Sequence, residues 1–384
     1  MEGIAPDYRA WAEIDLGALM HNFNIARKTG KKVMCVIKAD AYGHGAVACG
    51  LYLQEHGADA FAVACVSEAV ELREHGICLP ILVLGYTEAG YAELISRYKL
   101  TQTLVDEEHA RAMSAAAVRA KIQVSCHVKL DTGMSRAGIL AQGHIQCELA
   151  AGAVERIWAL PGLKISGVYS HFSSADIPEE RAYTAWQLDN FTRVLGLLAD
   201  KGIRPETCHI GNSAAIMNLP EARFDMVREG IMLYGLYPDN QPRLKGELMP
   251  VMSLKSRVSQ VRDMPEGTSV SYGRAYRSAG NMKMAVISAG YADGYSRRLG
   301  NQAYVVIGGR RYPQIGRVCM DMIMADVTGG DVHRGETAVL LGGGGMSMEE
   351  AAGLTGTINY ELACLVTPRA QRIYVGTEDS VKAD

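Results

Sequence analysis

The sequence predicts an α/β protein, with an N-terminal (β/α)8 barrel of the TIM type followed by a mostly β domain. Up to about residue 235, short apolar runs alternate with amphipathic helical stretches, which is typical of parallel strands joined by helices. After about residue 238, strand-like runs are separated by turns instead of helices. The predicted domains therefore cover residues 1–238 and 239–384.

The apolar runs of the first domain are short, which favours buried strands. Between two of them, the segment 67–76 has a candidate N-cap Ser67, apolar residues at helical spacing and a terminal Gly76. Eight parallel strands would close a barrel with its active site at their carboxyl ends. The seventh and eighth strands are weakly defined, so an open doubly wound sheet is the alternative. The runs are 33–37, 60–66, 81–84, 101–105, 124–130, 165–170, 207–210 and 226–227.

The second domain shows four strand-like runs, at 251–261, 284–288, 304–307 and 337–341. The glycines at 342–345 predict a flexible turn and not a phosphate loop, because no Lys-Ser/Thr pair follows them. Ser347 with Glu350 predicts a capping box that opens one short helix.

Composition excludes several classes of protein. The net charge of −3 without long runs of one sign argues against nucleic acid or an anionic membrane as the main partner. No apolar stretch approaches the ~18 residues of a membrane span, and residues 1–12 lack a signal-peptide core. Nine cysteines without a Cys-x-x-Cys spacing suggest neither a metal site nor a disulfide framework, and they fit the reducing cytoplasm.

Lys38 is the most informative residue of the chain. It follows the apolar run 33–37 and precedes Tyr42 and a glycine-containing turn. A lysine amine at a partly desolvated site can lose its proton and form a Schiff base with a carbonyl. A lone lysine at a strand end more often keeps its ammonium group in water.

The sequence of the segment 36–45, VIKADAYGHG, favours a lysine that forms a Schiff base. It resembles the pyridoxal-phosphate attachment motif of the bacterial alanine racemases, which are fold-type III enzymes. The resemblance implies that Lys38 carries pyridoxal 5'-phosphate as an internal aldimine and that Tyr42 touches its phosphate. Further matches continue in chain order to Tyr360, so the resemblance covers nearly the whole chain.

Racemisation needs a base on one face of the Cα atom and an acid on the other, with the cofactor delocalising the charge. The segment 270–273, VSYG, resembles the second-base motif of the same family. The resemblance implies that Tyr272 works opposite Lys38 and is delivered by the partner subunit of a homodimer. Taken alone, Tyr272 would be an ordinary tyrosine, because a phenol titrates near pH 10.

Three barrel segments resemble the family's cofactor loops. In HIGNSAA (209–215), Ser213 is implied to bind the phosphate, and in VREGIMLYG (227–235), Gly230 and Ile231 are implied to offer it backbone amides. Arg228 would face the pyridine nitrogen and leave it unprotonated, because a guanidinium has no acceptor. Its neighbour Glu229 is expected to point away from the ring. If Glu229 met the ring nitrogen instead of Arg228, the ring would be a stronger electron sink.

The remaining matches concern the substrate and the entrance. In KLDTGMSR (129–136), Arg136 is implied to bind the substrate carboxylate, with Lys129 aligned to a lysine that many relatives carbamylate. His171 is implied to bond near a barrel arginine and orient the tyrosine; by itself it could equally be a satisfied strand-end histidine. The partner subunit is implied to supply Met320, whose amide would bind the carboxylate, and Tyr360, which would contact the phosphate and narrow the pocket. Asp321 is implied to order the site, and Tyr291 is implied to line the entrance.

The resemblance implies an alanine racemase that interconverts L- and D-alanine by two-base proton transfer, with no metal, and supplies D-alanine for peptidoglycan. Serine racemases of vancomycin resistance typically replace the tyrosine at 360, so Tyr360 favours alanine over a serine or broad-spectrum substrate. A non-catalytic cofactor carrier would lack the second domain. A decarboxylase of the same fold would place a carboxylate, and not Arg228, at the ring nitrogen.

Overall fold

The computed structural model describes residues 9–241 and 246–376, so the first eight residues of the segment 1–12 lie outside the described part. The chain divides into two compact units. The barrel unit comprises residues 23–41 and 46–230, and the β unit comprises residues 1–22, 42–45 and 231–384. The division into domains 1–238 and 239–384 stays a prediction, and each unit is described by itself.

The barrel unit contains a parallel sheet in the order β10-β2-β3-β4-β5-β6-β8-β9. The amides of Asp225 and Arg228 donate to the carbonyls of Cys208 and Gly211, at 3.1 and 3.0 Å, and so join the two outermost strands. All eight predicted strands are present, which confirms the barrel. The strands are β2 (Lys32–Val36), β3 (Ala60–Val63), β4 (Ile81–Val83), β5 (Thr101–Leu104), β6 (Val124–Asp131), β8 (Leu163–Tyr169), β9 (Thr207–His209) and β10 (Met226–Glu229), with β7 (Ile139–Leu140) paired to β6.

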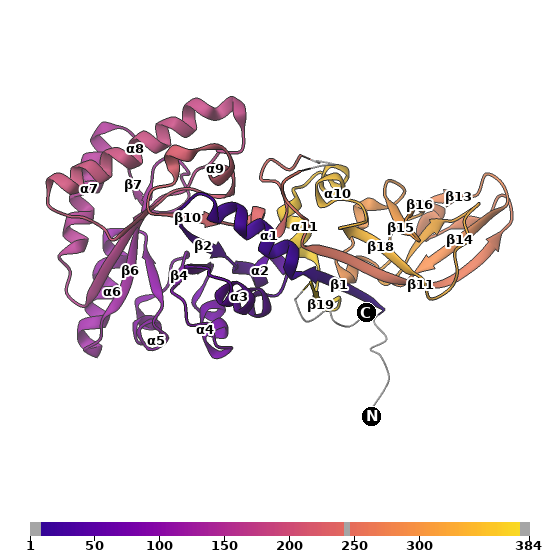
Figure 1. Ribbon diagram of the computed structural model, residues 1–384, viewed down its shortest axis with the longest axis horizontal. Coiled ribbons are helices and arrows are strands. Elements are labelled where there is room, and N and C mark those ends of the chain that lie inside the picture. The colour runs from indigo at the N-terminus through magenta and orange to yellow at the C-terminus, as the bar shows by residue number, and fades with distance from the viewer. Residues whose placement is uncertain (1–8, 242–245, 377–384) are drawn as a thin grey trace. The chain divides into compact units, whose positions relative to one another are not determined.

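Helices separate these strands along the chain and cover the outside of the sheet (Figure 1). Asp106 caps α6 (Glu107–Ala120), where its carboxylate accepts from the amide of His109 at 2.7 Å. The helices between the strands are α2 (Lys38–Gly43), α3 (Ala46–Glu55), α4 (Val66–Glu74), α5 (Ala92–Arg97), α6 (Glu107–Ala120), α7 (His144–Trp158), α8 (Arg181–Asp200) and α9 (Ser213–Asn218), with the 3-10 turns η1 (Ala89–Tyr91), η2 (Pro178–Glu180) and η3 (Pro220–Ala222). The helix α1 (Leu16–Arg27) precedes the first of these strands and begins in the β unit.

The predicted cap of α4 was wrong. The helix begins at Val66, and its N-cap is Cys65, which has an extended backbone and makes no side-chain cap. Ser67 therefore lies inside the first turn, where its hydroxyl is 3.1 Å from the Cys65 sulfur. The predicted glycine end is confirmed, because Gly76 has a φ of +95°, a conformation that favours glycine.

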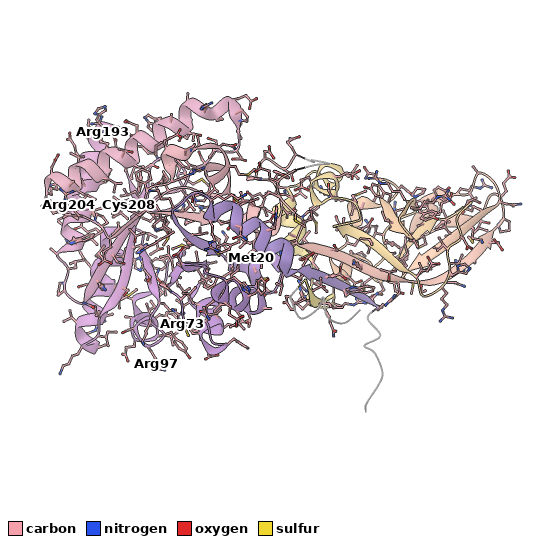
Figure 2. The ribbon with its side chains drawn as sticks, in the orientation of Figure 1. Met20, Arg73, Arg97, Arg193, Arg204 and Cys208 are labelled. Carbon is pink, nitrogen blue, oxygen red and sulfur yellow. The ribbon has the colours of Figure 1, made fainter. Side chains whose placement is uncertain are left out.

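Arg73, near the end of α4, ties this helix to the loops around it (Figure 2). Its guanidinium donates to the carbonyls of Ile77, Leu79 and Tyr98 at 2.8, 2.7 and 2.9 Å. Desolvation by burial lowers the pKa of Arg73. The guanidinium also donates to the carbonyl of Lys99 at 3.2 Å, so one cation satisfies four carbonyl groups in the turns of the barrel.

The β unit is built on a sheet in the order β14-β17-β16-β15-β18-β11-β1-β19. Its four strands predicted from the sequence are present, whereas β1 was not foreseen; it pairs antiparallel with β11 and parallel with β19. The strands are β1 (Ala10–Asp15), β11 (Met252–Met264), β12 (Ser269–Val270), β13 (Tyr276–Arg277), β14 (Met282–Ile287), β15 (Tyr304–Ile307), β16 (Arg310–Ile315), β17 (Ile323–Asp326), β18 (Thr337–Gly342) and β19 (Gln371–Val375).

Short helices and turns complete the β unit. Ser347 caps α10 and accepts from the amide of Glu350 at 3.0 Å, which is one half of the predicted capping box. The Glu350 carboxylate accepts from the Tyr304 hydroxyl at 3.0 Å instead of completing the box. A methionine-rich cluster that includes Met264, Met284 and Met324 fills the space under β11 and β14. The helices are α10 (Met348–Thr355) and α11 (Asn359–Leu365), with the 3-10 turns η4 (Ile231–Tyr234), η5 (Tyr272–Arg274), η6 (Tyr291–Asp293) and η7 (Arg297–Leu299). No helix within the described residues is long and apolar enough to cross a membrane.

Candidate active site

The barrel unit brings seven of the predicted residues to one edge of its sheet. Because the strands are parallel, the residues at their carboxyl ends share an edge, which is where barrel enzymes hold their active sites. Each predicted residue lies within or just after the last residues of a strand. They are Lys38 (after β2), Lys129 (β6), Arg136 (after β6), His171 (after β8), Ser213 (after β9), Arg228 (β10) and Gly230 (after β10).

The backbone after Lys38 forms a left-handed turn. Ala39, Asp40, Ala41 and Tyr42 all have φ between +52° and +54°, in a region that L-residues rarely adopt. Each such residue costs roughly 1–2 kcal/mol, so the surrounding structure must hold the turn in place. Strain of this kind clusters at functional sites.

Two carboxylates hold this turn within the barrel unit. Glu68 accepts from the amides of Ala39 at 2.8 Å and Ala64 at 2.6 Å, and so connects the residue after Lys38 to the end of β3. Asp40 accepts from the amide of Ala46 at 2.7 Å, where α3 begins. Glu68 could not be predicted from the sequence, because its acceptor role depends on a turn that no local pattern predicts.

Arg228 lies buried and is surrounded by neutral acceptors. Its guanidinium donates to the carbonyl of Ser170 at 2.7 Å and lies 2.7 Å from Nδ1 of His209 and 3.0 Å from Nδ1 of His171. Within the described ranges 9–241 and 246–376, no carboxylate pairs with it. Desolvation lowers the pKa of Arg228 to about 10, so it stays a cation at neutral pH. The predicted bond between His171 and a barrel arginine is present.

Glu229 is fully buried, and neither carboxyl oxygen has a hydrogen-bond partner among the described residues. Successive side chains of a strand point to opposite faces, so Glu229 points away from the face that Arg228 occupies. The expectation that it points away fits this geometry, but the arginine partner that a buried carboxylate would need is missing. Desolvation by burial raises the pKa of Glu229 well above its usual range.

We expect Glu229→Gln to stabilise the protein, and increasingly so as the pH rises. The folded protein keeps a proton on Glu229 that the unfolded chain releases above the usual carboxyl pKa, so stability falls with rising pH. The slope is about 1.4 kcal/mol per pH unit until the folded-state pKa is passed. Glutamine keeps the shape but cannot ionise. Denaturant midpoints between pH 5 and 8 measure the effect.

The matched control is Glu221→Gln, because Glu221 is exposed and close in sequence. Its midpoint should follow that of the unaltered protein at every pH. Parallel curves for Glu229→Gln and the unaltered protein would show that Glu229 is ionised in the folded state, which would contradict this account.

Lys129 is buried near three other cations. Its pKa is lowered to about 8, first by desolvation and then by the charges of Arg136, Arg228 and Lys38. Its ammonium nitrogen lies 5.8 Å from the centre of the Tyr169 ring. Lys129 therefore stays mostly protonated at neutral pH but has a much larger neutral fraction than an ordinary lysine, and the edge of the barrel presents a concentration of positive charge.

Arg136 lies exposed in the loop after β6. Asp131 shapes this loop, because its carboxylate accepts from the amides of Gly133 and Ser135 at 3.1 and 2.9 Å. Ser135 has a φ of +54° and so turns the chain immediately before Arg136. The loop presents the guanidinium to solvent at the edge of the barrel.

Ser213, at the start of α9, and Gly230, directly after β10, lie next to each other. The amide of Gly230 donates to the hydroxyl of Ser213 at 3.1 Å. Asn212 caps the helix that Ser213 begins, accepting from the amide of Ala215 at 3.1 Å. A hydroxyl and an amide brought together at a helix start are suited to an anion.

In the β unit, three predicted segments are joined by hydrogen bonds. The hydroxyl of Ser271 donates to the carbonyl of Arg317 at 2.7 Å, which ties the Tyr272 turn to the segment 317–321. The amides of Tyr291 and Ala292 donate to the carbonyls of Cys319 and Met320, both at 3.1 Å. A Cβ atom at Gly290 would lie 2.2 Å from the Cys319 carbonyl, so only glycine allows this approach.

A buried carboxylate, Asp293, supports the same turns. It accepts from the amide of Gly290 at 2.9 Å and pairs with Arg9 and Arg369. Arg369 also pairs with Asp321, so the predicted ordering role of Asp321 has a structural counterpart. The sequence did not indicate Asp293, because its partners come from the two ends of the chain.

An aromatic cluster forms around Tyr42 in the β unit. The ring centres of Tyr42 and Tyr234 are 5.0 Å apart, and those of Tyr42 and Tyr360 are 6.3 Å apart. His44 stacks on Tyr234 at 4.4 Å. The resemblance implied that Tyr360 comes from a partner subunit, but it lies beside Tyr42 of its own chain. The structure therefore favours one chain as the source of both tyrosines.

Tyr272 lines an open groove of about 560 Å³ on the β unit. Its side chain is 68% exposed, and Met320 beside it is 51% exposed. Apolar side chains such as Met264, Val270 and Met324 form part of the floor. A tyrosine and a methionine that stay in water at an apolar groove are typical of a surface that another surface covers.

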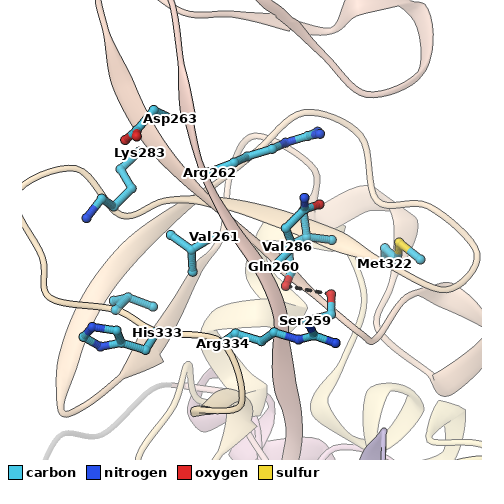
Figure 3. A pocket seen from close by; sticks show the side chains of 11 residues that line it. Ser259, Gln260, Val261, Arg262, Asp263, Lys283, Val286, Met322, His333 and Arg334 are labelled. Carbon is cyan, nitrogen blue, oxygen red and sulfur yellow. Dashed lines mark hydrogen bonds between the residues drawn. The ribbon is translucent and has the colours of Figure 1, made fainter.

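A second groove of about 780 Å³ lies along β11 (Figure 3). Charged side chains line it, among them Arg262, Lys283 and Arg334, and the hydroxyl of Ser259 donates to the carbonyl of Val286 at 3.1 Å. None of the residues predicted for the active site lines this groove.

Comparison with known proteins gives the same assignment for both units. Residues 14–238 match the alanine racemase N-terminal domain family, and residues 251–374 match the alanine racemase C-terminal domain family. The chain belongs to the alanine racemase family. Alanine racemases from Clostridium novyi and Carboxydothermus hydrogenoformans are 40% and 43% identical, covering 97% and 95% of this chain and 97% and 99% of theirs.

Solved alanine racemases have the same fold. The structures from Clostridium difficile and Streptomyces coelicolor match with TM-scores of 0.88 and 0.89, at 36% and 34% identity. They cover 97% and 96% of this chain, and the chain covers 97% and 98% of theirs. Alanine racemases are isomerases that depend on pyridoxal 5'-phosphate.

The residues of the barrel edge fit this cofactor on chemical grounds. The cofactor needs an amine for its aldehyde, donors for its phosphate and a partner for its ring nitrogen. Lys38 offers an amine at this edge, and the Ser213 hydroxyl lies beside the Gly230 amide, which donates to it at 3.1 Å. Arg228 offers only donors. Lys129 and the three cations near it suit an anionic ligand.

Proposed function

We propose that this protein interconverts L-alanine and D-alanine with pyridoxal 5'-phosphate held at the barrel edge. The observation that supports this most is the environment of Arg228, a buried cation whose partners are histidine nitrogens and carbonyls. A decarboxylase of the same fold would be expected to hold a carboxylate at this place. The two-unit fold also argues against a cofactor carrier, which would lack the β unit.

Lys38 would hold the cofactor, and Tyr42, Ser213, Gly230, Ile231 and Tyr360 would bind its phosphate. When bound, the cofactor withdraws electron density from the Cα atom of the substrate and so acidifies the Cα proton. Arg228 would donate to the ring nitrogen and keep it unprotonated, since a guanidinium has no acceptor to offer. This limits the electron withdrawal and with it side reactions such as transamination.

Two groups would move the proton. The Nζ atom of Lys38 would accept the Cα proton of the D enantiomer, and the Oη atom of Tyr272 that of the L enantiomer. Each would return a proton, from its own side of the Cα atom, when the reaction runs in the opposite direction. His171 would orient the tyrosine, while Arg136 and the amide of Met320 would hold the substrate carboxylate. Asp321 would order the Met320 turn, and Tyr291 would line the entrance.

We further propose that Tyr272, Met320 and Tyr291 serve the barrel of a partner subunit in a homodimer. The exposure of Tyr272 and Met320 on one apolar groove supports this, because a proton-transfer group should work away from bulk water. Tyr360 is assigned to its own chain, on the basis of its position beside Tyr42.

Lys129 is proposed to carry a carbamate. The amine must be neutral to attack CO2, and its pKa of about 8 gives a neutral fraction much larger than that of an ordinary lysine. The C–N bond forms as the amine loses a proton to solvent. The carbamate anion would then balance Arg136 and Arg228, whose charges lower the pKa of Lys129. Intact mass spectrometry under CO2 would detect it.

We expect a preference for alanine over serine. Tyr360 narrows the pocket, although a pocket built for a methyl group rejects an added hydroxyl by only about a hundredfold. Racemisation of L-alanine and L-serine by the purified protein, with and without added cofactor, tests the proposal. Comparable turnover of serine would contradict the alanine assignment, and no turnover of either with cofactor bound would favour a carrier or a decarboxylase.

The biological role proposed is the supply of D-alanine for peptidoglycan in the cytoplasm. None of the nine cysteines, all of which lie in the described residues, forms a disulfide, and desolvation raises the pKa of the buried Cys49 thiol to about 12. Such thiols are inert and suit a reducing compartment.

A further inference from the structure

His127 lies behind Arg228 and has no role in the site described so far. It belongs to β6, and its ring Nδ1 is 3.1 Å from Nε2 of His209. Nδ1 of His209 is in turn 2.7 Å from the Arg228 guanidinium. All three side chains are buried. A chain of hydrogen bonds therefore runs from Arg228 through His209 to His127.

The donor and acceptor roles in this chain follow from Arg228. A guanidinium only donates, so Nδ1 of His209 must accept. A neutral imidazole then carries its proton on Nε2, which donates to Nδ1 of His127. Desolvation, followed by the charge of Arg228, lowers the pKa of His127 to about 4 and that of His209 well below its usual range. Both rings are therefore neutral at physiological pH.

Packing leaves the two rings little freedom. Tyr169 stacks on His209 with ring centres 4.9 Å apart and planes within 2°. The Tyr169 hydroxyl is fixed by Thr103 at 2.9 Å. Gly167 faces His127, and a Cβ atom at position 167 would lie 2.6 Å from the His127 ring. Any side chain there would displace the ring, so Gly167 keeps the space that His127 fills.

We propose that His127 is a positioning residue for Arg228. By accepting the Nε2 proton of His209, it keeps Nδ1 of His209 free to hold the guanidinium. Without that acceptor, His209 either leaves a buried N–H unpaired or moves its proton to Nδ1, where it would face another donor. Both outcomes weaken the hold on Arg228. The inference rests on the proposed racemisation, in which Arg228 would donate to the cofactor ring.

Three variants of the full-length protein test this proposal. His127→Phe keeps a ring but removes the acceptor, and His127→Gln restores an acceptor oxygen. Gly167→Ala leaves the histidine in place but pushes its ring away, and it serves as the second variant if His127→Phe does not fold. Nitrogen NMR of histidine-labelled protein without cofactor reports which His209 nitrogen carries the proton. Kinetics with alanine follow for each variant.

In the unaltered protein, we expect His209 to be protonated at Nε2 only. His127→Phe and Gly167→Ala should change the His209 signals. They should also lower kcat roughly tenfold or more, since the hydrogen bond between His209 and the charged Arg228 is lost. KM for alanine should change little, because Arg136 and Met320 hold the carboxylate. His127→Gln should restore most of the His209 signals and most of kcat.

Protonation of Nδ1 of His209 in the unaltered protein would overturn the proposal. Unchanged His209 signals and unchanged kcat in His127→Phe would overturn it as well. Failure of the proposed function would look different, because the unaltered, cofactor-loaded protein would then racemise neither alanine nor serine.

Discussion

Lys38→Ala should remove both the attachment of the cofactor and the turnover of alanine. The variant loses the amine that would carry the aldehyde, and it also loses one of the two proton-transfer groups. We expect turnover to fall by at least about a thousandfold, as when a reacting side chain is removed. Borohydride reduction of the unaltered, cofactor-loaded protein, followed by peptide mass spectrometry, should place the cofactor mass on Lys38.

The matched control is Lys32→Ala, because Lys32 is exposed at the opposite end of the same strand. It should keep the absorbance of bound cofactor and full turnover. Lys38→Arg separates charge from chemistry, since it keeps a cation but offers no amine that can lose its proton. A cofactor mass on another lysine of the unaltered protein would contradict the assignment.

Tyr272→Phe should keep the cofactor but lose racemisation. The change removes a hydroxyl and retains the ring, so the groove and the turn around Tyr272 should be preserved. Loss of a general acid–base group lowers turnover by about 10²- to 10⁴-fold. Absorbance of bound cofactor and exchange of the Cα proton of each enantiomer with deuterium in solvent measure the two effects separately. Full racemisation by the variant would rule out the two-base assignment.

The same variants test whether Tyr272 serves a partner subunit. In a mixture of Lys38→Ala and Tyr272→Phe chains that exchange subunits freely, half of the dimers are mixed. Each mixed dimer has one complete site if Tyr272 crosses the interface, so activity should return to about a quarter of the normal value. A mixture that stays inactive after verified exchange would show that both residues act within one chain.

Elements that depend on local pattern could be predicted, and contacts between distant segments could not. The eight barrel strands are short apolar runs between helices, and this signal is local. β1 was missed because its partners, β11 and β19, come from the far end of the chain. The cap of α4 was misplaced because Cys65 is already extended, so that the helix starts one residue before Ser67.

The candidate site shows the same division. Lys38, Ser213 and Arg228 stand in motifs of contiguous residues, and the structure places them at one edge of the barrel. The residues that hold them were missed, because Glu68, His127 and Asp293 act through backbone groups or rings far away in sequence. Glu229 was noticed for its charge, but its burial without a partner follows only from the packed barrel.

The left-handed turn after Lys38 sets a limit on transplanting this chemistry into other barrels. A designer who copies only the lysine onto a strand end would obtain an ordinary right-handed exit, because residues such as Ala39 and Ala41 favour it. In this protein the turn after Lys38 stays left-handed because two carboxylates hold it, Glu68 on the following strand–helix connection and Asp40 in the turn itself. The smallest portable module is therefore two consecutive strand–helix units, and not a single strand with its lysine.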